Sequence, residues 1–238
     1  MSDFNNIFIT TLKENSLTEY AAHADKFERL FTALAETNKL YNLTAVTDEE
    51  GVSALHFADS LLAVKYIKGS GRLLDIGCGA GFPSLPIAMV RDDLTVYGID
   101  STAKKIAFST KFAEENGINN FISRAARAEE LALTKERESY DYVTARAVAR
   151  LNILSELALP FVKIGGYFVA LKGSLGDEEY KEAKKAIKTL GGRLEKIEKS
   201  KLITAKGEQD RTFIIIKKVS KTPEIYPRAY SKIAKKPL

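Results

Sequence analysis

Three glycines, Gly77, Gly79 and Gly81, lie between two apolar runs in the stretch LLDIGCGAGFPSLPIA, residues 73–88. Glycines allow a tight strand-to-helix turn and let a ligand approach the backbone closely. Pro83 suits the first turn of a helix, where its missing N–H would have had no partner. In an open parallel sheet, ligands bind beyond the carboxyl ends of the strands. The loop is therefore expected to form the floor of a nucleotide-shaped pocket.

Two acidic residues accompany this loop. Asp75 precedes Gly77 by two positions, and Asp100 ends the next apolar run, 23 residues after Gly77. The spacing is G-x-G-x-G rather than the dinucleotide pattern G-x-G-x-x-G. A phosphate would be repelled by Asp75, whereas a cationic ligand would be tolerated, and Asp100 can accept both hydroxyls of a ribose. Alone the loop could be a packing turn, but with both acids it favours S-adenosylmethionine over NAD.

The remaining chemically reactive side chains are few. One cysteine, Cys78, excludes an internal disulfide, and two histidines, His23 and His56, leave little material for zinc, so no metal is expected. Cys78 is interpreted as a small loop residue rather than a nucleophile. His56 and Asp59 share one helix face, and they are expected to form a hydrogen-bonded pair that braces the N-terminal helices against the core.

The elements that must position these residues change in character at Gly71. Before it, Phe27, Leu30, Phe31, Leu34 and Leu40 are spaced for one helix face, and ALHFADSLLAVKYI (54–67) repeats such a pattern. We expect a helical N-terminal extension over residues 1–68, a cofactor-binding domain over 69–218, and a basic tail over 219–238 packed on that domain.

After Gly71, short apolar runs alternate with helical stretches. This alternation predicts an α/β fold with a doubly wound, mainly parallel sheet and helices on both faces. The expected strands are RLLDI (72–76), LTVYGID (94–100), NNFISRA (119–125), YDYVTAR (140–146), GGYFVALK (165–172), RLEKIEKSKLI (193–203) and RTFIIIKK (211–218). The expected helices are PSLPIAMVRD (83–92), TAKKIAFSTKFAEENG (102–117), AEELALTKE (128–136), LNILSELALPFV (151–162) and DEEYKEAKKAIKTL (177–190).

Charge is distributed unevenly along the chain. Residues 181–238 hold 17 Lys and Arg against six Asp and Glu, whereas the whole chain has a net charge of +5. A basic C-terminal quarter indicates a polyanionic partner such as nucleic acid, or only a solvated basic face. No run of about 18 apolar residues and no signal-peptide pattern is present. A cytoplasmic protein, without membrane binding, is the expectation.

The chain resembles the bacterial small-subunit ribosomal RNA methyltransferase G family over roughly residues 27–238. The matching stretches are NKLYNLT (38–44), HFADSL (56–61), DIGCGAGFPSLPIA (75–88), IDSTAKK (99–105), RAEEL (127–131), TARA (144–147), LKG (171–173), YPR (226–228) and the terminal KPL. Two departures are small: Ser84 stands where a further glycine is common, and the N-terminal region has no tryptophan. The resemblance implies a Rossmann-like methyltransferase fold and transfer of a methyl group from S-adenosylmethionine to guanine N7 in 16S rRNA.

By the same resemblance, Gly77 and Phe82 line the cofactor site, Ala128 and Glu129 lie against the adenine, and Arg146 completes the pocket. From the residues alone, without the family resemblance, Phe82 could equally be a residue that packs at the start of a helix. Glu129 could likewise be an acid that the helix dipole favours.

Guanine N7 carries a free lone pair, so no general base is expected and no catalytic residue is assigned. Arg146, Lys172 and Arg228 are candidates for contact with RNA.

Three functions stay open from the sequence: an rRNA guanine-N7 methyltransferase, a small-molecule methyltransferase or NAD oxidoreductase on the same scaffold, and a non-catalytic RNA-binding assembly factor. A cytosine-C5 mechanism is rejected because Cys78 is on the cofactor side. The expected partner is 16S rRNA, within the small ribosomal subunit or an assembly intermediate, and the expected state is a monomer.

Overall fold

A seven-stranded sheet in the order β3-β2-β1-β4-β5-β7-β6 organises the chain. In the computed structural model, which describes residues 3–238, β1 to β5 are parallel and β7 runs antiparallel to both β5 and β6. Residues 1 and 2 of the expected extension lie outside the described part. The strands are β1 (Gly71–Ile76), β2 (Leu94–Asp100), β3 (Phe121–Ala125), β4 (Tyr140–Arg146), β5 (Val162–Lys172), β6 (Gly192–Thr204) and β7 (Gly207–Lys218).

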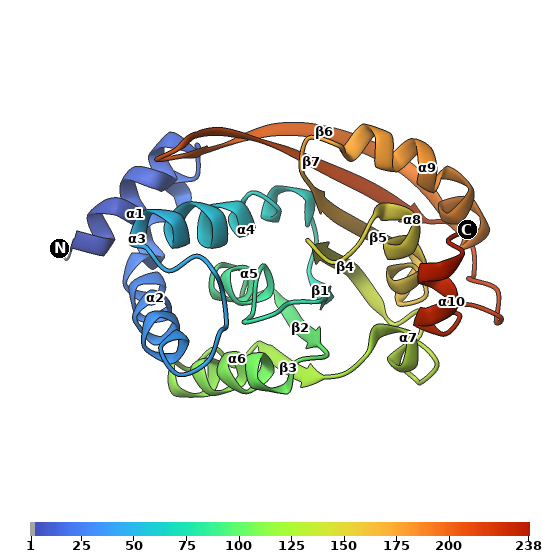
Figure 1. The fold of residues 1–238 in the computed structure, drawn as a ribbon, viewed down its shortest axis with the longest axis horizontal. Coiled ribbons are helices and arrows are strands. Elements are labelled where there is room, and N and C mark those ends of the chain that lie inside the picture. The colour runs from blue at the N-terminus through green and yellow to red at the C-terminus, as the bar shows by residue number, and fades with distance from the viewer. Residues whose placement is uncertain (1–2) are drawn as a thin grey trace.

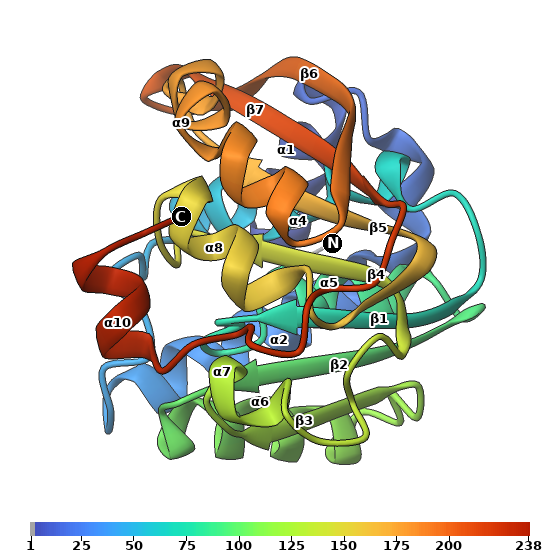
Figure 2. The same ribbon diagram turned by 90° about the vertical axis from the view of Figure 1, so that its right-hand side faces the viewer.

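Helices cover both faces of the sheet, as the sequence predicts (Figures 1 and 2). One layer contains the N-terminal helices with α5 and α6, and the other contains α7 to α10. The α-helices are α1 (Asp3–Glu14), α2 (Ala24–Asn38), α3 (Glu49–Gly51), α4 (Asp59–Leu61), α5 (Ser84–Val90), α6 (Ala103–Glu115), α7 (Ala128–Leu131), α8 (Leu151–Ala158), α9 (Gly176–Thr189) and α10 (Tyr230–Lys235). The 3-10 helices are η1 (Thr18–His23) and η3 (Val64–Tyr66), and η2 (Val52–Ala58) is a π-helix.

Alternate residues of the central strands enter different cores. In β1, Leu73 belongs to the core that contains the N-terminal helices, whereas its neighbour Leu74 belongs to the core that contains α8 and α9. In β7, Ile215 likewise belongs to the first of these cores and Ile216 to the second. Strands buried on both faces are therefore almost continuously apolar, which is the pattern that made them recognisable in the sequence.

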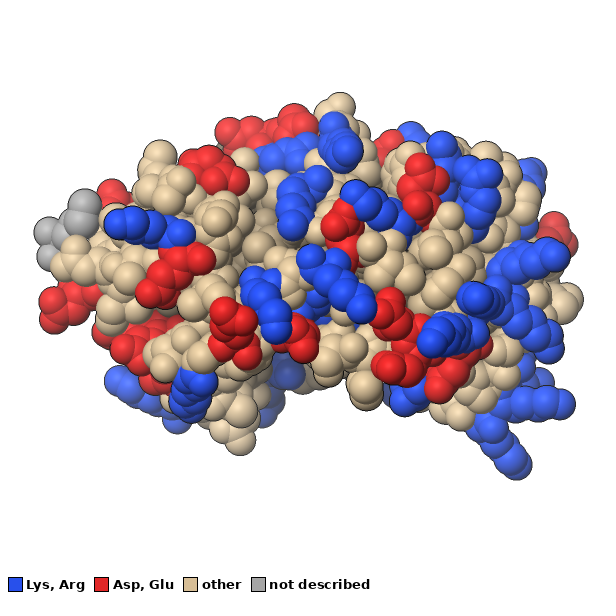
Figure 3. Space-filling model, turned by 90° about the horizontal axis from the view of Figure 1, so that it is seen from above, with Lys and Arg blue, Asp and Glu red and all other residues tan. Residues whose placement is uncertain are grey.

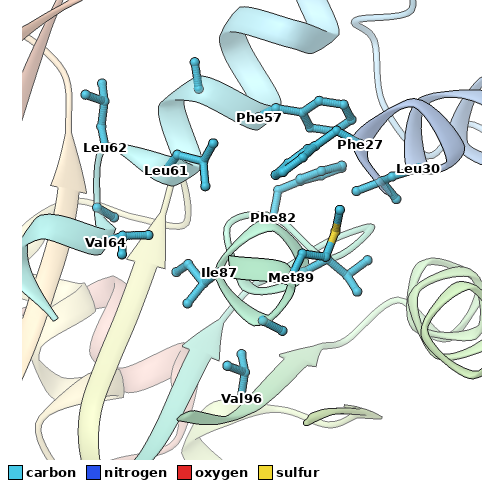
Figure 4. Packing of buried hydrophobic residues seen from close by; sticks show 14 of the residues in the cluster. Phe27, Leu30, Phe57, Leu61, Leu62, Val64, Phe82, Ile87, Met89 and Val96 are labelled. Carbon is cyan, nitrogen blue, oxygen red and sulfur yellow. The ribbon is translucent and has the colours of Figure 1, made fainter. Parts of the chain in front are cut away.

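The N-terminal helices form a layer of the main core. Phe8 of α1 lies 4.6 Å from Phe27 of α2, and Phe27 lies 5.0 Å from Phe57 of η2, measured between ring centroids. Phe57 in turn lies 6.0 Å from Phe82 beside the glycine loop. Figure 4 shows the rings of Phe27, Phe57 and Phe82 pointing toward one another. This packing connects the helical region directly to the expected ligand pocket.

The second N-terminal helix ends earlier than predicted. Its last residue is Asn38, and Leu40, expected on the buried face, is 74% exposed. The Asn38 side chain accepts hydrogen bonds from the backbone N–H groups of Leu43 and Thr44, at 2.7 and 3.0 Å. An asparagine that binds nearby backbone competes with helix continuation. Residues 39–47 consequently form a loop, and this loop reaches the pocket.

Two other predicted helices also differ from the structure. The stretch 54–67 is divided among a π-helix, α4 and a 3-10 turn, and AEELALTKE contributes only the four residues of α7.

The last two strands form a long hairpin that reaches back to the first helix (Figure 1). The amide of Asn15, just after α1, donates to the Ile203 carbonyl at 3.1 Å and accepts from the Ile203 N–H at 2.8 Å.

The C-terminal tail is held against the other end of the sheet. Arg137 donates to the carbonyl oxygens of Thr222 and Tyr226 at 2.7 and 2.8 Å, and Ile233 of α10 is fully buried.

Basic side chains gather over α9 and the tail. Seen from above, Lys and Arg side chains are frequent from the middle of the molecule to its right-hand end (Figure 3), the end at which α9 and α10 lie in Figure 1. The exposed lysines of α9 are Lys181, Lys184, Lys185 and Lys188. Among residues 3–238, no helix has the length and apolar character that a membrane span requires.

Candidate functional site

A cavity of about 500 Å³ opens at the carboxyl ends of β1, β2 and β4. The carboxyl ends of these strands and helix α10 lie at the same edge of the sheet (Figure 2). Seven of the nine residues predicted to bind a cofactor line the cavity: Gly77, Gly79, Phe82, Asp100, Ala128, Glu129 and Arg146. Asp75 and Gly81 do not.

The glycine loop is tied to the end of the second strand. The N–H groups of Gly77 and Cys78 donate to the Ile99 carbonyl at 2.8 and 3.0 Å, and Gly79 donates to Oδ2 of Asp100 at 3.0 Å. Gly79 has φ +56°, and a Cβ built there would meet nothing nearer than Lys105 Cδ, at 3.9 Å. The backbone at Gly79 is therefore open to a ligand in a conformation that glycine adopts most readily.

The Asp100 carboxylate is held in place from two sides. Oδ1 accepts from the N–H of Thr102 at 2.8 Å, and Oδ2 accepts from Gly79. Each carboxylate oxygen has two lone pairs, so each can accept one further hydrogen bond. The arrangement suits two adjacent hydroxyls of a ribose.

The opposite wall comes from α7 and from the C-terminal tail. Ala128 and Glu129 are the first two residues of α7, where backbone N–H groups have no partner within the helix. Leu157 of α8 and Tyr230 of α10 complete this wall. Tyr230 was not singled out in the sequence, because nothing local indicates that α10 folds back to the cavity.

Asp75 lies beneath the loop, contrary to the expectation that it meets the ligand. Its side chain is fully buried, Oδ2 accepts from the N–H of Ser84 at 3.2 Å, and Oδ1 accepts from the Thr144 hydroxyl at 3.1 Å. Burial raises the pKa of Asp75 to about 7. Asp75 thus connects β1 with β4 and the start of α5. The carboxylates that line the cavity belong to Asp100 and Glu129.

Phe82 and Gly81 have packing roles. Phe82 is 6% exposed, and its ring stacks on His56 with centroids 4.7 Å apart. The packing interpretation of Phe82 therefore holds, although the residue also borders the cavity. Gly81 has φ +102°, and a Cβ there would lie 2.5 Å from Cδ1 of Leu85. Gly81 shapes the turn into α5.

Asp59 joins two arginines beside the cavity. Its Oδ2 accepts from Nη1 of Arg146 at 2.8 Å, and its Oδ1 accepts from Nε of Arg211 at 2.6 Å. The Asp59 side chain is 6% exposed, and those of the two arginines are 15% and 17% exposed. Nη1 of Arg146 also donates to the Leu55 carbonyl at 2.8 Å. One carboxylate therefore links α4 to the end of β4 and to the first half of β7.

His56 does not pair with Asp59, so that prediction was wrong. Its Nε2 instead lies 2.8 Å from the Thr44 hydroxyl, in the loop that follows α2. Burial, and then the nearby Arg146, lowers the pKa of His56 to about 4. The ring is therefore neutral at pH 7. Cys78 is also buried, which raises the pKa of its thiol and agrees with its interpretation as a small loop residue.

A second cavity, of about 620 Å³, adjoins the first. Both are lined by His56, Arg146, Ala147 and Val148. Lys172 borders only the second cavity, where its Nζ lies 2.8 Å from Oε2 of Glu179.

Arg228 lies at neither cavity. Nε and Nη2 of its guanidinium donate to the two carboxylate oxygens of Glu156, at 2.8 and 2.6 Å. Glu156 is fully buried in α8. A bidentate pair of this kind anchors the tail. The Arg228 side chain is 23% exposed, and its contact with RNA stays a prediction.

Comparison with known proteins identifies close relatives. The family model for rRNA small subunit methyltransferase G matches residues 23–209. A ribosomal RNA small subunit methyltransferase G from Staphylococcus carnosus is 44% identical over 234 residues, which cover 97% of each chain. The protein of the same name from Bacillus subtilis is 43% identical over 224 residues, with 93% of each chain covered.

Solved structures share the fold at low identity. A geranyl diphosphate C-methyltransferase from Streptomyces coelicolor A3(2) superimposes with a TM-score of 0.55 and 17% identity, over 72% of this chain and 79% of that one. A SAM-dependent methyltransferase from Methanosarcina mazei gives 0.52 and 18%, over 66% and 97%. These likenesses confirm the predicted Rossmann-like methyltransferase fold.

Proposed function

Because the chain belongs to the rRNA small subunit methyltransferase G family, we propose that it methylates N7 of a guanine in the 16S rRNA of the small ribosomal subunit, with S-adenosylmethionine as methyl donor. The observation that carries the proposal is the cavity at the carboxyl ends of β1, β2 and β4, with the open backbone of Gly79 beside the fixed carboxylate of Asp100.

The donor set fits a nucleoside without phosphates. Asp100 would hold the ribose hydroxyls, and the first turn of α7 at Ala128 and Glu129 would meet the adenine. The loop spacing G-x-G-x-G differs from the G-x-G-x-x-G of dinucleotide sites, and the carboxylate of Glu129 would repel a pyrophosphate in this cavity, which favours S-adenosylmethionine over NAD. When bound, S-adenosylmethionine supplies an electrophilic methyl group on a sulfonium.

The residues around the cavities suit a reaction that depends on alignment. Guanine N7 has an in-plane lone pair, so no proton has to leave before it can act as a nucleophile. Holding two reactants in contact is then the main source of rate acceleration. His56, with its pKa near 4, is a neutral packing partner of Phe82 rather than a base.

The basic C-terminal quarter supports an RNA partner. Exposed lysines such as Lys181 and Lys185 lie on α9, whose residue Glu179 borders the second cavity. Phosphate contacts give affinity that falls with salt, and they carry little sequence information.

The test uses small ribosomal subunits from cells that lack this protein. The purified protein, given tritiated S-adenosylmethionine, is expected to label 16S rRNA, and nucleoside analysis should find the label in N7-methylguanosine. Asp100→Ala should weaken S-adenosylmethionine binding by about 30-fold, because hydrogen bonds to a charged acceptor are lost. The matched control is Asp92→Ala, an exposed acid just before the same strand, which should bind and methylate as wild type does.

Three outcomes would contradict the proposal. Binding of NADH without binding of S-adenosylmethionine would indicate an oxidoreductase. Cofactor binding with label in a small molecule but not in rRNA would indicate another acceptor. RNA binding without any methyl transfer would indicate an assembly factor.

We also propose that the protein acts as a monomer in the cytoplasm. Light scattering should give the mass of one 26.3 kDa chain, and cell fractionation should place the protein with the small ribosomal subunit.

A further inference from the structure

The second cavity has charged lining residues of its own, which the first cavity does not share. Among them are Lys172 at the end of β5, Glu179 of α9 and Arg211 of β7. We propose that this cavity receives the target guanine, and that Lys172 and Glu179 read its Watson–Crick edge. The inference rests on the proposed function, because it concerns the base that is methylated.

The position of the second cavity beside the first determines how the guanine must be oriented in it. The methyl donor would occupy the first cavity, so N7 of the guanine must point toward the shared wall of His56, Arg146, Ala147 and Val148. On a purine, N1 and the 2-amino group lie on the side away from N7. They must then point toward residues that border the second cavity alone, which include Lys172 and Glu179.

Lys172 and Glu179 are held in position before any base arrives. Their side chains are 7% and 15% exposed. Lys172 Nζ donates to the Ala149 carbonyl and to Oε2 of Glu179, and the same Oε2 accepts from the N–H of Leu151 at 2.7 Å. Among residues 3–238, the two groups that bind the Glu179 carboxylate, Lys172 Nζ and the Leu151 N–H, both contact Oε2. Oε1 of Glu179 and the third proton of Lys172 are thus available to a ligand.

This pair of groups matches guanine and opposes adenine. Guanine presents the O6 acceptor beside the N1–H and 2-amino donors, which correspond to an ammonium beside a carboxylate. Adenine presents a 6-amino donor and a bare N1, so donor would meet donor and acceptor would meet acceptor. A site that is built to hydrogen-bond a substrate rejects analogues that leave its polar groups unpaired. A stacked base cannot reach this pair of groups, so the guanine must leave its stack.

Binding of mononucleotides tests the inference directly. With S-adenosylhomocysteine present, calorimetry on the full chain should show that guanosine 5′-monophosphate binds about tenfold more tightly than inosine 5′-monophosphate, which lacks the 2-amino group. Glu179→Gln should reduce this ratio to within about twofold, since its amide oxygen is needed by Leu151. Glu178→Gln, an exposed neighbour on the same helix, is the matched control and should keep the wild-type ratio.

The results separate this inference from the proposed function. Wild-type protein that makes N7-methylguanosine but shows no preference for the guanine nucleotide, or no binding up to about 10 mM, would overturn the inference alone. A Glu179→Gln variant that keeps the ratio would also overturn it. A guanine preference without any methylation of 16S rRNA would leave the base site standing and remove the proposed function. The wild-type ratio requires no variant, so misfolding of a variant cannot hide a negative result.

Discussion

Replacement of Asp59 by asparagine tests the bridge between the N-terminal helices and the sheet. The carboxylate accepts from Arg146 and Arg211 at 2.8 and 2.6 Å, and all three side chains are mostly buried. Asparagine keeps the shape but removes the negative charge, which leaves two cations close together without compensation. Removing one partner of a buried ion pair costs about 3–5 kcal/mol.

The partial exposure of the two arginines reduces this cost, because water can reach part of each guanidinium. We expect the free energy of unfolding to fall by about 3 kcal/mol. For a chain of this size that corresponds to a decrease in Tm of about 6–12 °C. Calorimetric unfolding of wild-type and variant protein at pH 7 measures the difference.

A matched control exists on the surface of the same molecule. Asp177 pairs with Lys199, and their side chains are 38% and 71% exposed, so Asp177→Asn should move Tm by much less, about 1–2 °C. If Asp59→Asn moved Tm as little as this control does, the bridge would contribute no more than a solvated ion pair. The argument that buried charge connects α4 to β4 and β7 would then be wrong.

Two further predictions follow from the same site. Burial holds the pKa of His56 near 4, so between that value and about 6.5 the unfolded chain binds the extra proton and stability falls as the pH drops. Between pH 7.5 and pH 5 this loss of stability amounts to about 2 kcal/mol, because about 1.5 pH units below the unfolded pKa contribute about 1.4 kcal/mol each. Denaturant unfolding at the two pH values should show that His56→Phe loses about 2 kcal/mol less stability than wild type does, and an equal loss in the two proteins would refute the prediction. Asp75, with its raised pKa, contributes the opposite slope in both proteins. Gly79→Ala and Gly117→Ala place a Cβ in uncrowded space at φ +56° and +65°, so each should cost about 1–2 kcal/mol of stability. Only Gly79→Ala should weaken S-adenosylmethionine binding in calorimetry, and equal affinities would show that no ligand approaches Gly79.

The central strands β1, β4 and β5 were predictable because they are largely buried on both faces. β2 and β4 have the predicted bounds, Leu94–Asp100 and Tyr140–Arg146. Helix ends were less predictable where a side chain competes with the backbone. Asn38 ends α2 by binding Leu43 and Thr44, and in the sequence this residue appears only as one more polar position.

The site was predictable as far as the chain itself brings its parts together. Gly79 lies in the loop that follows β1, and Asp100 ends β2; since β1 and β2 are parallel neighbours, the proximity of the two residues follows from the topology. The role of Asp75 depends on Thr144, 69 residues away, and the role of Arg228 depends on Glu156, 72 residues away. Local pattern carries no information about such partners. A carboxylate near a glycine loop and an arginine in a basic tail therefore pointed to ligand contacts, but not to the bonds by which both hold the fold together.

The hydrogen bonds between Asn15 and Ile203 join positions 188 residues apart. At synthesis rates of about 5–20 residues per second, the segment between them takes about 10–40 s to produce. During that time Phe8 can already pack on Phe27 and Phe57, because all three are close in sequence, but the end of α1 has no hairpin to bind. The first helix of the chain is therefore completed only after one of the last strands has been made, although α1 itself is among the first segments to be synthesised.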